Sequence, residues 1–330
     1  MTEQVDNAAE VLRGKMSDHT ALDPEVRAAW DELQRLDLPE SRQVLDFPQR
    51  RKQFAVEGAF WNQPSTPGVA SELQSVKLLG REVSMRRFVP PVREAGTLLY
   101  CHGGGWCIGD HNTNEALARA LALACQREVL TIDYGLAPEH PYPRGLNEIV
   151  AACKYLSSSG PVWLAGDSAG ANLALAAVLT LLGQPEQPEL MLLFYGAYGA
   201  NGDTASHREN GDGRWGLTTE EMRAYWDTYA PGASPDDPMV YPLRADLRGL
   251  PPTFVVGAAL DCLRDDSRLL AERLAQARVP SEFLEAPGVP HGFMKMQGRV
   301  RAAAAAVQQA AAFSRRHYPF ETESPQHGIS

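Results

Sequence analysis

The chain has 330 residues, of which 44% are hydrophobic and 22% are charged, which is the composition of a globular protein and excludes a disordered or collagen-like chain. Its net charge of −10 gives no electrostatic footprint for a polyanion, so we expect no nucleic-acid partner. The five cysteines form no C-x-x-C pair, the N-terminus lacks a basic start with an apolar run, and no stretch approaches the roughly 20 apolar residues of a spanning helix. We therefore expect a cytoplasmic protein with no disulfide framework and no membrane partner.

The first seventy residues contain helical patterns and no strand-like apolar run. Asp23 and Pro24 form an N-cap and a first-turn proline, and the apolar residues that follow share one helical face: Val26, Trp30, Leu33 and Leu36. A second helical stretch carries Phe47, Phe54, Phe60 and Trp61, and a proline- and glycine-containing cluster at 64–68 ends it. We interpret residues 1–70 as a helical cap segment that either covers a site or forms a homodimer contact, because both uses give the same composition.

Residues 71–315 alternate short apolar runs with helical patterns, which is typical of βαβ units and a mostly parallel sheet. The predicted strands span 75–79, 83–89, 97–101, 128–133, 162–165, 190–195, 253–257 and 282–285. The predicted helices span 114–125, 144–157, 169–182, 264–277 and 299–314. This order predicts an α/β fold with an eight-stranded, mostly parallel sheet, covered by helices on both faces.

The alternation is interrupted at 199–238 by a glycine-rich, charged stretch. Thr218 followed by Glu221 predicts a capping box at the start of one helix in this stretch. We interpret the segment as a cap insertion above the sheet, and residues 316–330 as a polar C-terminal tail.

The strongest local motif is G-x-S-x-G, in which Ser168 lies between a buried run ending at Ala165 and an alanine- and leucine-rich helix. In this context the motif is a strand-to-helix turn that exposes a nucleophilic serine. The alternative is a plain glycine turn with a solvated serine, and the buried strand before the motif and the helix after it disfavour this alternative.

A serine hydroxyl needs a base and an orienting acid, which follow it in the order acid then histidine. His291 is the predicted base, because it follows a predicted strand in a tight loop, whereas His207 lies in the insertion and His317 and His327 lie near the tail. Asp261 is the predicted acid, since it follows the strand 253–257 after a short turn. Asp265 and Asp266 are its rivals, but acidic residues at a helix start are expected simply to complement the helix dipole.

Hydrolysis of an acyl group also needs hydrogen-bond donors for the oxyanion. His102, Gly103, Gly104 and Gly105 follow the strand ending at Cys101, where an H-G-G-G oxyanion loop belongs. We expect the donors to be the amides of Gly103, Gly104 and Ala169. Phosphate binding is disfavoured, because neither G-x-x-x-x-G-K-[ST] nor G-x-G-x-x-G is present here.

Several separated motifs resemble those of the hormone-sensitive lipase family of α/β-hydrolases, and within it most closely those of bacterial acetyl esterases. They are the stretch His102 to Trp106, Asp133-Tyr134 with 136–143, the elbow around Ser168, Asp261 with 265–270, and His291-Gly292-Phe293. The resemblance extends from about Leu98 to Phe313. Two positions depart from many relatives: Cys262 replaces a proline after the acid, and Gly135 replaces an arginine.

The resemblance implies a cytoplasmic serine carboxylesterase on short acyl chains, with a helical cap over an α/β-hydrolase fold. It implies a triad of Ser168, Asp261 and His291, a small-molecule ester as substrate, and no metal or organic cofactor. Cys262 is expected to be a packed small hydrophobe rather than a second nucleophile.

Four further residues are expected near the site. We expect Glu139 to fix the oxyanion loop by hydrogen bonding, and Asp167 to lie beside it, each having a cap or turn role as the alternative. Trp106 and Trp215 are candidates for the substrate pocket.

Two other functions remain open from the residues alone. One is hydrolysis of an amide or N-acyl group by the same triad, and the other is ligand binding by a hydrolase fold that has lost catalysis. The presence of all three triad residues disfavours the second. A membrane-surface lipase is disfavoured by the acidic charge and the lack of a basic amphipathic helix.

Overall fold

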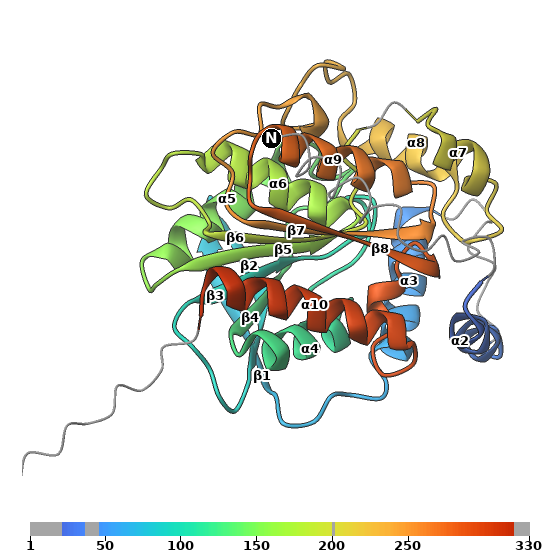
Figure 1. Cartoon of the computed structure of the whole chain (residues 1–330), viewed down its shortest axis with the longest axis horizontal. Helices are drawn as coiled ribbons and strands as arrows, with labels where there is room; N and C mark the ends of the chain where they lie inside the picture. The colour runs from blue at the N-terminus through green and yellow to red at the C-terminus, as the bar shows by residue number, and fades with distance from the viewer. Residues whose placement is uncertain (1–21, 37–45, 200–201, 320–330) are drawn as a thin grey trace, which may run out of the picture.

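A sheet of eight strands lies at the centre of the molecule (Figure 1), in the computed structural model, which describes residues 22–36, 46–199 and 202–319. The strands are β1 Ala70–Leu78, β2 Arg81–Val89, β3 Thr97–Cys101, β4 Glu128–Ile132, β5 Val162–Asp167, β6 Leu190–Phe194, β7 Thr253–Leu260 and β8 Ser281–Pro290. Their spatial order is β1-β2-β4-β3-β5-β6-β7-β8, and β2 is antiparallel to both neighbours whereas the pairs from β4 to β8 are parallel. The predicted eight-stranded, mostly parallel sheet is confirmed.

Helices cover both faces of this sheet, as predicted (Figure 1). They are α4 Glu115–Cys125, α5 Arg144–Ser157, α6 Ala169–Leu181, α9 Arg264–Gln276 and α10 Arg301–His317, with short 3₁₀ helices η1 Pro242–Arg244 and η2 Phe293–Lys295. Side chains of α5, α6 and α9 share one apolar core with one face of the sheet, and those of α4 and α10 share a second core with the other face. The helix α6 is buried along almost its whole length, which explains why its sequence is apolar all round.

Four cap helices gather at one end of the sheet (Figure 1). They are α2 Pro24–Gln34, α3 Phe47–Trp61, α7 Ala205–Asn210 and α8 Thr219–Tyr229. Asp23 caps α2 by accepting from the Glu25 amide, and the predicted capping box of Thr218 and Glu221 begins α8. Among the described residues, no helix has the length and apolar character needed to cross a membrane.

Several boundaries differ from the prediction. β1 begins at Ala70 rather than at 75. Its first residues are exposed at the sheet edge and lack the apolar alternation by which a strand is predicted, so the predicted strand began too late. β7 continues to Leu260 instead of ending at 257, and α10 continues to His317, so the boundary expected for the tail at 316 falls inside a helix.

The cap also differs in two respects. The insertion contains two helices rather than the one predicted. The additional helix, α7, is short and polar and lacks the apolar periodicity by which a helix is predicted. Leu36 was expected on the apolar face of α2, but it lies beyond the helix end and is exposed. Parts of the expected cap segment and tail, at residues 1–21, 37–45 and 320–330, lie outside the described residues.

Candidate active site

Ser168 stands on a sharp turn between β5 and α6. Its backbone has φ 54° and ψ −122°, a region that non-glycine residues rarely adopt and that is common at functional sites. The neighbouring glycines allow this turn. A Cβ on Gly166 would lie 2.5 Å from the Gly170 carbonyl carbon, and a Cβ on Gly170 would lie 2.0 Å from the carbonyl oxygen of Cys101. The helix α6 therefore begins directly against the end of β3, with Ser168 at its first turn.

The three residues predicted to form a triad come together. His291 Nε2 lies 2.9 Å from Ser168 Oγ, and His291 Nδ1 lies 2.7 Å from Asp261 Oδ2. Asp261 is only 1% exposed, and its other oxygen accepts a 2.9 Å hydrogen bond from the Leu263 amide. This chain of hydrogen bonds is the geometry that a nucleophile, a base and an orienting acid require.

The rival acids, Asp265 and Asp266, form hydrogen bonds with other residues. Asp266 Oδ2 accepts hydrogen bonds from the amides of Tyr198 and Gly199, at 2.6 and 2.9 Å. Asp265 Oδ2 accepts from the Ser206 amide at 2.8 Å. Both carboxylates therefore hold the segment that leads into the insertion, and the distance to the imidazole selects Asp261.

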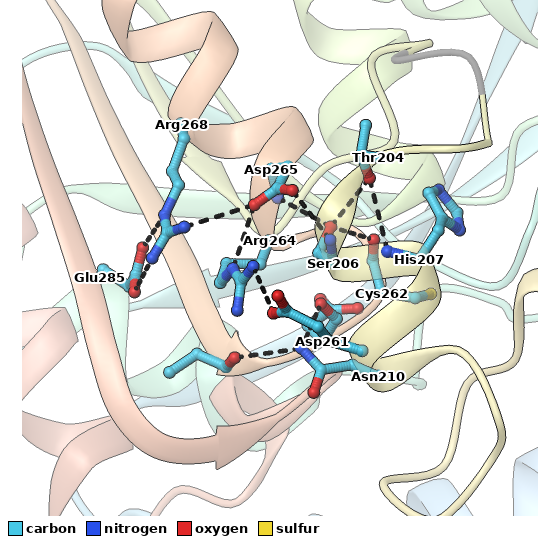
Figure 2. A network of polar contacts seen from close by, with 12 residues as sticks. Thr204, Ser206, His207, Asn210, Asp261, Cys262, Arg264, Asp265, Arg268 and Glu285 are labelled. Atoms are coloured by element: carbon cyan, nitrogen blue, oxygen red, sulfur yellow. Dashed lines mark hydrogen bonds and ion pairs between the residues drawn. The ribbon is translucent and has the colours of Figure 1, made fainter. Parts of the chain in front are cut away.

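Two residues of α7 form hydrogen bonds with the turn that contains Asp261. Figure 2 shows these residues, Ser206 and Asn210, directed at that turn. Ser206 Oγ donates to the Cys262 carbonyl at 2.7 Å, and Asn210 Nδ2 donates to the Asp261 carbonyl at 3.3 Å. Side-chain hydrogen bonds thus fix a turn in which Cys262 stands where many relatives of the resembled family have proline. The Cys262 thiol is fully buried, and this burial raises its pKa, so it is packed as expected for a small hydrophobe.

The oxyanion loop departs from the expected set of donors. The Gly103 N–H donates a 2.8 Å hydrogen bond to Asp167 Oδ1, so this amide is already engaged by a carboxylate. Gly104 and Gly105 line the cavity that holds Ser168, and their φ angles of 123° and 56° favour glycine. Ala169 is the first residue of α6, where an amide has no acceptor within its own helix. The amides available beside Ser168 are therefore those of Gly104, Gly105 and Ala169.

Two residues of the same loop serve to build it. The His102 ring lies stacked on Tyr134, with 4.4 Å between ring centroids, and its Nδ1 lies 2.8 Å from the Gly103 carbonyl oxygen. Trp106, a predicted pocket residue, is 1% exposed and packs between Trp226 and Tyr229 at centroid distances of 4.2 and 4.6 Å. The expectation for Trp106 was wrong, because this ring is enclosed by other aromatic side chains and does not line the cavity.

A cavity of about 310 Å³ opens above Ser168 and His291. Its walls come from both parts of the cap and from the catalytic loops. The α2 and α3 helices contribute Trp30, Leu33, Arg50, Phe54, Glu57 and Trp61, and the insertion contributes Trp215, Leu217, Met222 and Tyr225. Trp215 therefore lies where the sequence placed it, and the N-terminal helices cover the site.

Glu139 acts on the loop through an intermediate residue. The Arg51 guanidinium of α3 donates to both carboxylate oxygens of Glu139, at 2.9 and 2.6 Å, and to the carbonyls of Cys107 and Ala137, at 2.8 and 2.9 Å. The hydrogen bonds from Arg51 lower the pKa of Glu139 to about 2. Glu139 thus orients Arg51, and Arg51 fastens α3 to the segment that follows the oxyanion loop.

Metal binding finds no support in the part of the chain that the structure describes, where no cluster of three or more histidine, cysteine or acidic side chains is arranged to hold an ion. The cavity is lined by apolar and aromatic groups with a few charged side chains, a composition suited to a small organic molecule.

Several residues that line the cavity were not predicted from the sequence. Arg50, Phe54, Glu57 and Trp61 follow the spacing of one helical face, and that spacing was a signal that α3 presents this face to the cavity. Lys295 also lines the cavity, four residues after His291, but nothing in its local sequence distinguishes it from a surface lysine.

Comparison with known proteins supports this architecture. A model of the alpha/beta hydrolase fold family matches residues 98–295, which is more than half of the chain. A hyperthermophilic esterase from the archaeon Pyrobaculum calidifontis is 26% identical, with a TM-score of 0.82 over 90% of this chain and 99% of its own. An alpha/beta hydrolase enzyme from the metagenome of Lake Arreo, Spain, is 29% identical, with a TM-score of 0.82 over 91% and 99%. A thermostable esterase from Pseudomonas putida is 26% identical, with a TM-score of 0.82 over 92% and 99%.

Proposed function

Because the chain belongs to the alpha/beta hydrolase fold family, we propose that it is a serine carboxylesterase of the hormone-sensitive lipase type, which hydrolyses acetyl to butyryl esters. The observation that carries this proposal is the hydrogen-bonded chain from Ser168 through His291 to Asp261 at the floor of a covered cavity. The similarity to the esterases of Pyrobaculum calidifontis and Pseudomonas putida supports an ester as substrate.

In the first half of the proposed reaction, His291 Nε2 accepts the proton of Ser168 Oγ as the oxygen attacks the ester carbonyl. Asp261 holds the imidazole through Nδ1 and stabilises its protonated form. The amides of Gly104, Gly105 and Ala169 donate to the oxyanion, at about 3–4 kcal/mol for each essential donor. His291 then protonates the leaving alcohol, and the acyl group stays on Ser168.

In the second half, water enters where the alcohol left. His291 Nε2 accepts a proton from this water, the water oxygen attacks the acyl carbonyl, and the same proton returns to Ser168 Oγ as the acid leaves. A cavity of about 310 Å³ lies at the lower end of the range for small-molecule sites, which favours short acyl chains.

The test is steady-state hydrolysis of p-nitrophenyl acetate, butyrate, octanoate and palmitate by the wild type, by Ser168→Ala and by Ser158→Ala, the last being a control at an exposed serine on the surface. We expect rates that fall beyond butyrate, that vanish in Ser168→Ala and that persist in the control. p-Nitroacetanilide in the same assay distinguishes an amidase. Equal inertness of the wild type and Ser168→Ala would reject the esterase and favour a binding protein.

A further inference from the structure

Lys295 places a cation inside the proposed active site. It lies on η2, four residues after His291, and lines the cavity together with Ser168. Its Nζ lies 5.3 Å from the centre of the Phe54 ring and 5.9 Å from that of Trp61, both on α3. A Cβ on Gly292 would lie 3.7 Å from the same Nζ. The amine therefore stands between the cap and the loop that carries His291.

The carboxylates of this cavity have other partners. Asp167 Oδ1 accepts from Tyr100, Gly103 and Asn114, at 2.7, 2.8 and 2.7 Å. Glu221 Oε2 accepts from the Thr218 amide at 2.9 Å. Both acidic groups are thus used in holding the fold.

Glu57 is the remaining acidic group, and its Oε1 accepts from Gln53 Nε2 at 3.1 Å. Over the described ranges of the chain, no carboxylate makes an ion pair with Lys295, whose close contacts are the two aromatic rings. Burial lowers the pKa of the Lys295 amine, Arg50 lowers it further, and the charges of Glu57 and Asp167 act in the opposite direction. A cation in this position lacks a direct hydrogen-bonding anion, and aromatic faces compensate only part of the lost hydration.

The geometry of the proposed reaction bears on whether the acyl or the alcohol portion of an ester would lie near Lys295. The oxyanion must point to the amides around Gly104 and Ala169, whereas the leaving oxygen must accept a proton from His291 Nε2. An alcohol portion that continues from this oxygen along the loop after His291 would reach Lys295, which lines the same cavity.

Resting on the esterase function proposed above, we propose that Lys295 is a specificity-determining residue that binds a carboxylate on the alcohol portion of the substrate, so that the preferred substrates are short-chain O-acyl hydroxy acids. Water is consumed at the ester bond, which yields the acyl acid and the free hydroxy acid, and the bound carboxylate is unchanged. Glu57 is the internal competitor for the ammonium and weakens this preference.

The test uses pairs of acetyl esters that differ only in charge. The acetyl esters of glycolate, 3-hydroxypropanoate and 4-hydroxybutanoate are each compared with the corresponding primary amide, and kcat/KM is measured by acetate release. At one of the three chain lengths we expect the wild type to prefer the carboxylate by about 10-fold or more, the scale of a charge-assisted hydrogen bond. The preference falls as salt is raised, which requires no variant.

Variants test whether the preference for carboxylate substrates depends on Lys295. Lys295→Met and the polar Lys295→Gln each remove the preference, and Glu57→Gln increases it. Lys52→Met is the matched control, because Lys52 is an exposed residue on the same helix α3, and its loss changes the net charge equally while keeping the preference.

Two results would overturn the inference. One is a wild type with equal kcat/KM for carboxylate and amide at all three lengths, and the other is a preference that survives in both Lys295 variants. A preference for monoethyl succinate over its amide, lost in Lys295→Met, would move the carboxylate to the acyl portion and refute the alcohol-side assignment. Failure of the wild type to hydrolyse any of these esters or the p-nitrophenyl esters would instead reject the esterase function, and the inference with it.

Discussion

Asp167 binds the oxyanion loop through the Gly103 amide and is not part of the triad. Replacing Asp167 therefore tests how the position of the loop affects catalysis while the triad residues are kept. Its Oδ1 accepts three buried hydrogen bonds, from Tyr100 Oη, from the Gly103 amide and from Asn114 Nδ2, at 2.7 to 2.8 Å. Hydrogen bonds to a charged acceptor contribute about 1.5–3 kcal/mol each, and those to a neutral acceptor contribute about 1 kcal/mol. Asp167→Asn keeps the acceptor, and a difference of about 0.5–2 kcal/mol for each of the three bonds lowers the unfolding free energy by about 1.5–6 kcal/mol. Asp167→Ala instead leaves the three buried donors without this acceptor.

The catalytic effect follows from the Gly103 bond. When the Gly103 peptide is released, the amide of Gly104 moves away from the position of the oxyanion, and loss of one such donor costs about 10²–10³-fold in kcat. We therefore expect Asp167→Ala to lower kcat on p-nitrophenyl acetate by about 100-fold or more with a small change in KM, and Asp167→Asn to lower it by no more than about 10-fold.

Tyr100→Phe is the control for this experiment, because it removes one donor from the same carboxylate and leaves the Gly103 bond in place. Its unfolding free energy should fall by about 1.5–3 kcal/mol while kcat is retained within a few-fold. If Asp167→Ala is destabilised in urea but keeps the wild-type kcat, the carboxylate is structural only and the loop is placed by other contacts.

Three further results are expected. Arg51→Ala lowers the unfolding free energy by about 2 kcal/mol, because the carbonyls of Cys107 and Ala137 lose their donor. Glu139→Gln changes the unfolding free energy by less than about 1 kcal/mol, because the ion pair of Glu139 with Arg51 is half exposed. Equal losses for the two variants in urea titrations would contradict this order. Burial raises the pKa of Glu148, but hydrogen bonds led by Arg81 lower it overall, so its contribution is complete above the unfolded pKa near 4.5 and is lost as pH falls through the folded value. Glu148→Gln should therefore cost about 3 kcal/mol at pH 7 and progressively less toward pH 3, and a cost that does not depend on pH would refute the linkage. Gly105→Ala places a Cβ 2.3 Å from the Tyr225 ring and should lower kcat by about 10-fold or more, with circular dichroism unchanged.

The sheet was predictable from the sequence because its signals are local. Apolar runs of strand length, helical periods and capping residues each depend on a few neighbouring side chains, and they placed all eight strands. The triad was predictable for a related reason, since chain order and turn chemistry left one histidine and one aspartate in suitable loops. Lengths were less predictable, as at β7, because the end of a strand depends on whether the neighbouring strand β8 continues beside it.

The parts that were not predictable depend on contacts between distant segments. The amide of Gly103 is engaged by a residue 64 positions later, and no pattern around either residue records that pairing. Trp106 has φ 58°, and only the three-dimensional packing shows that its ring lies among other aromatic side chains rather than in the cavity. The role expected for Glu139 was also incomplete, because it acts through Arg51, 88 positions away.

One helix connects substrate selection with the catalytic geometry. The α3 helix presents Phe54 and Trp61 to the cavity, and from another face Arg51 binds the segment that follows the oxyanion loop. The same helix packs Phe47 and Phe54 against the buried Cys107 and its neighbours. A cap docked in this way is part of the support of the oxyanion loop, so a change that loosens α3 alters both the substrates accepted and the position of the Gly104 amide. Variants that widen the cavity from this helix should therefore lose kcat even on acetate. Variants of Trp215, whose ring has no described contact with the oxyanion loop, should change chain-length preference alone.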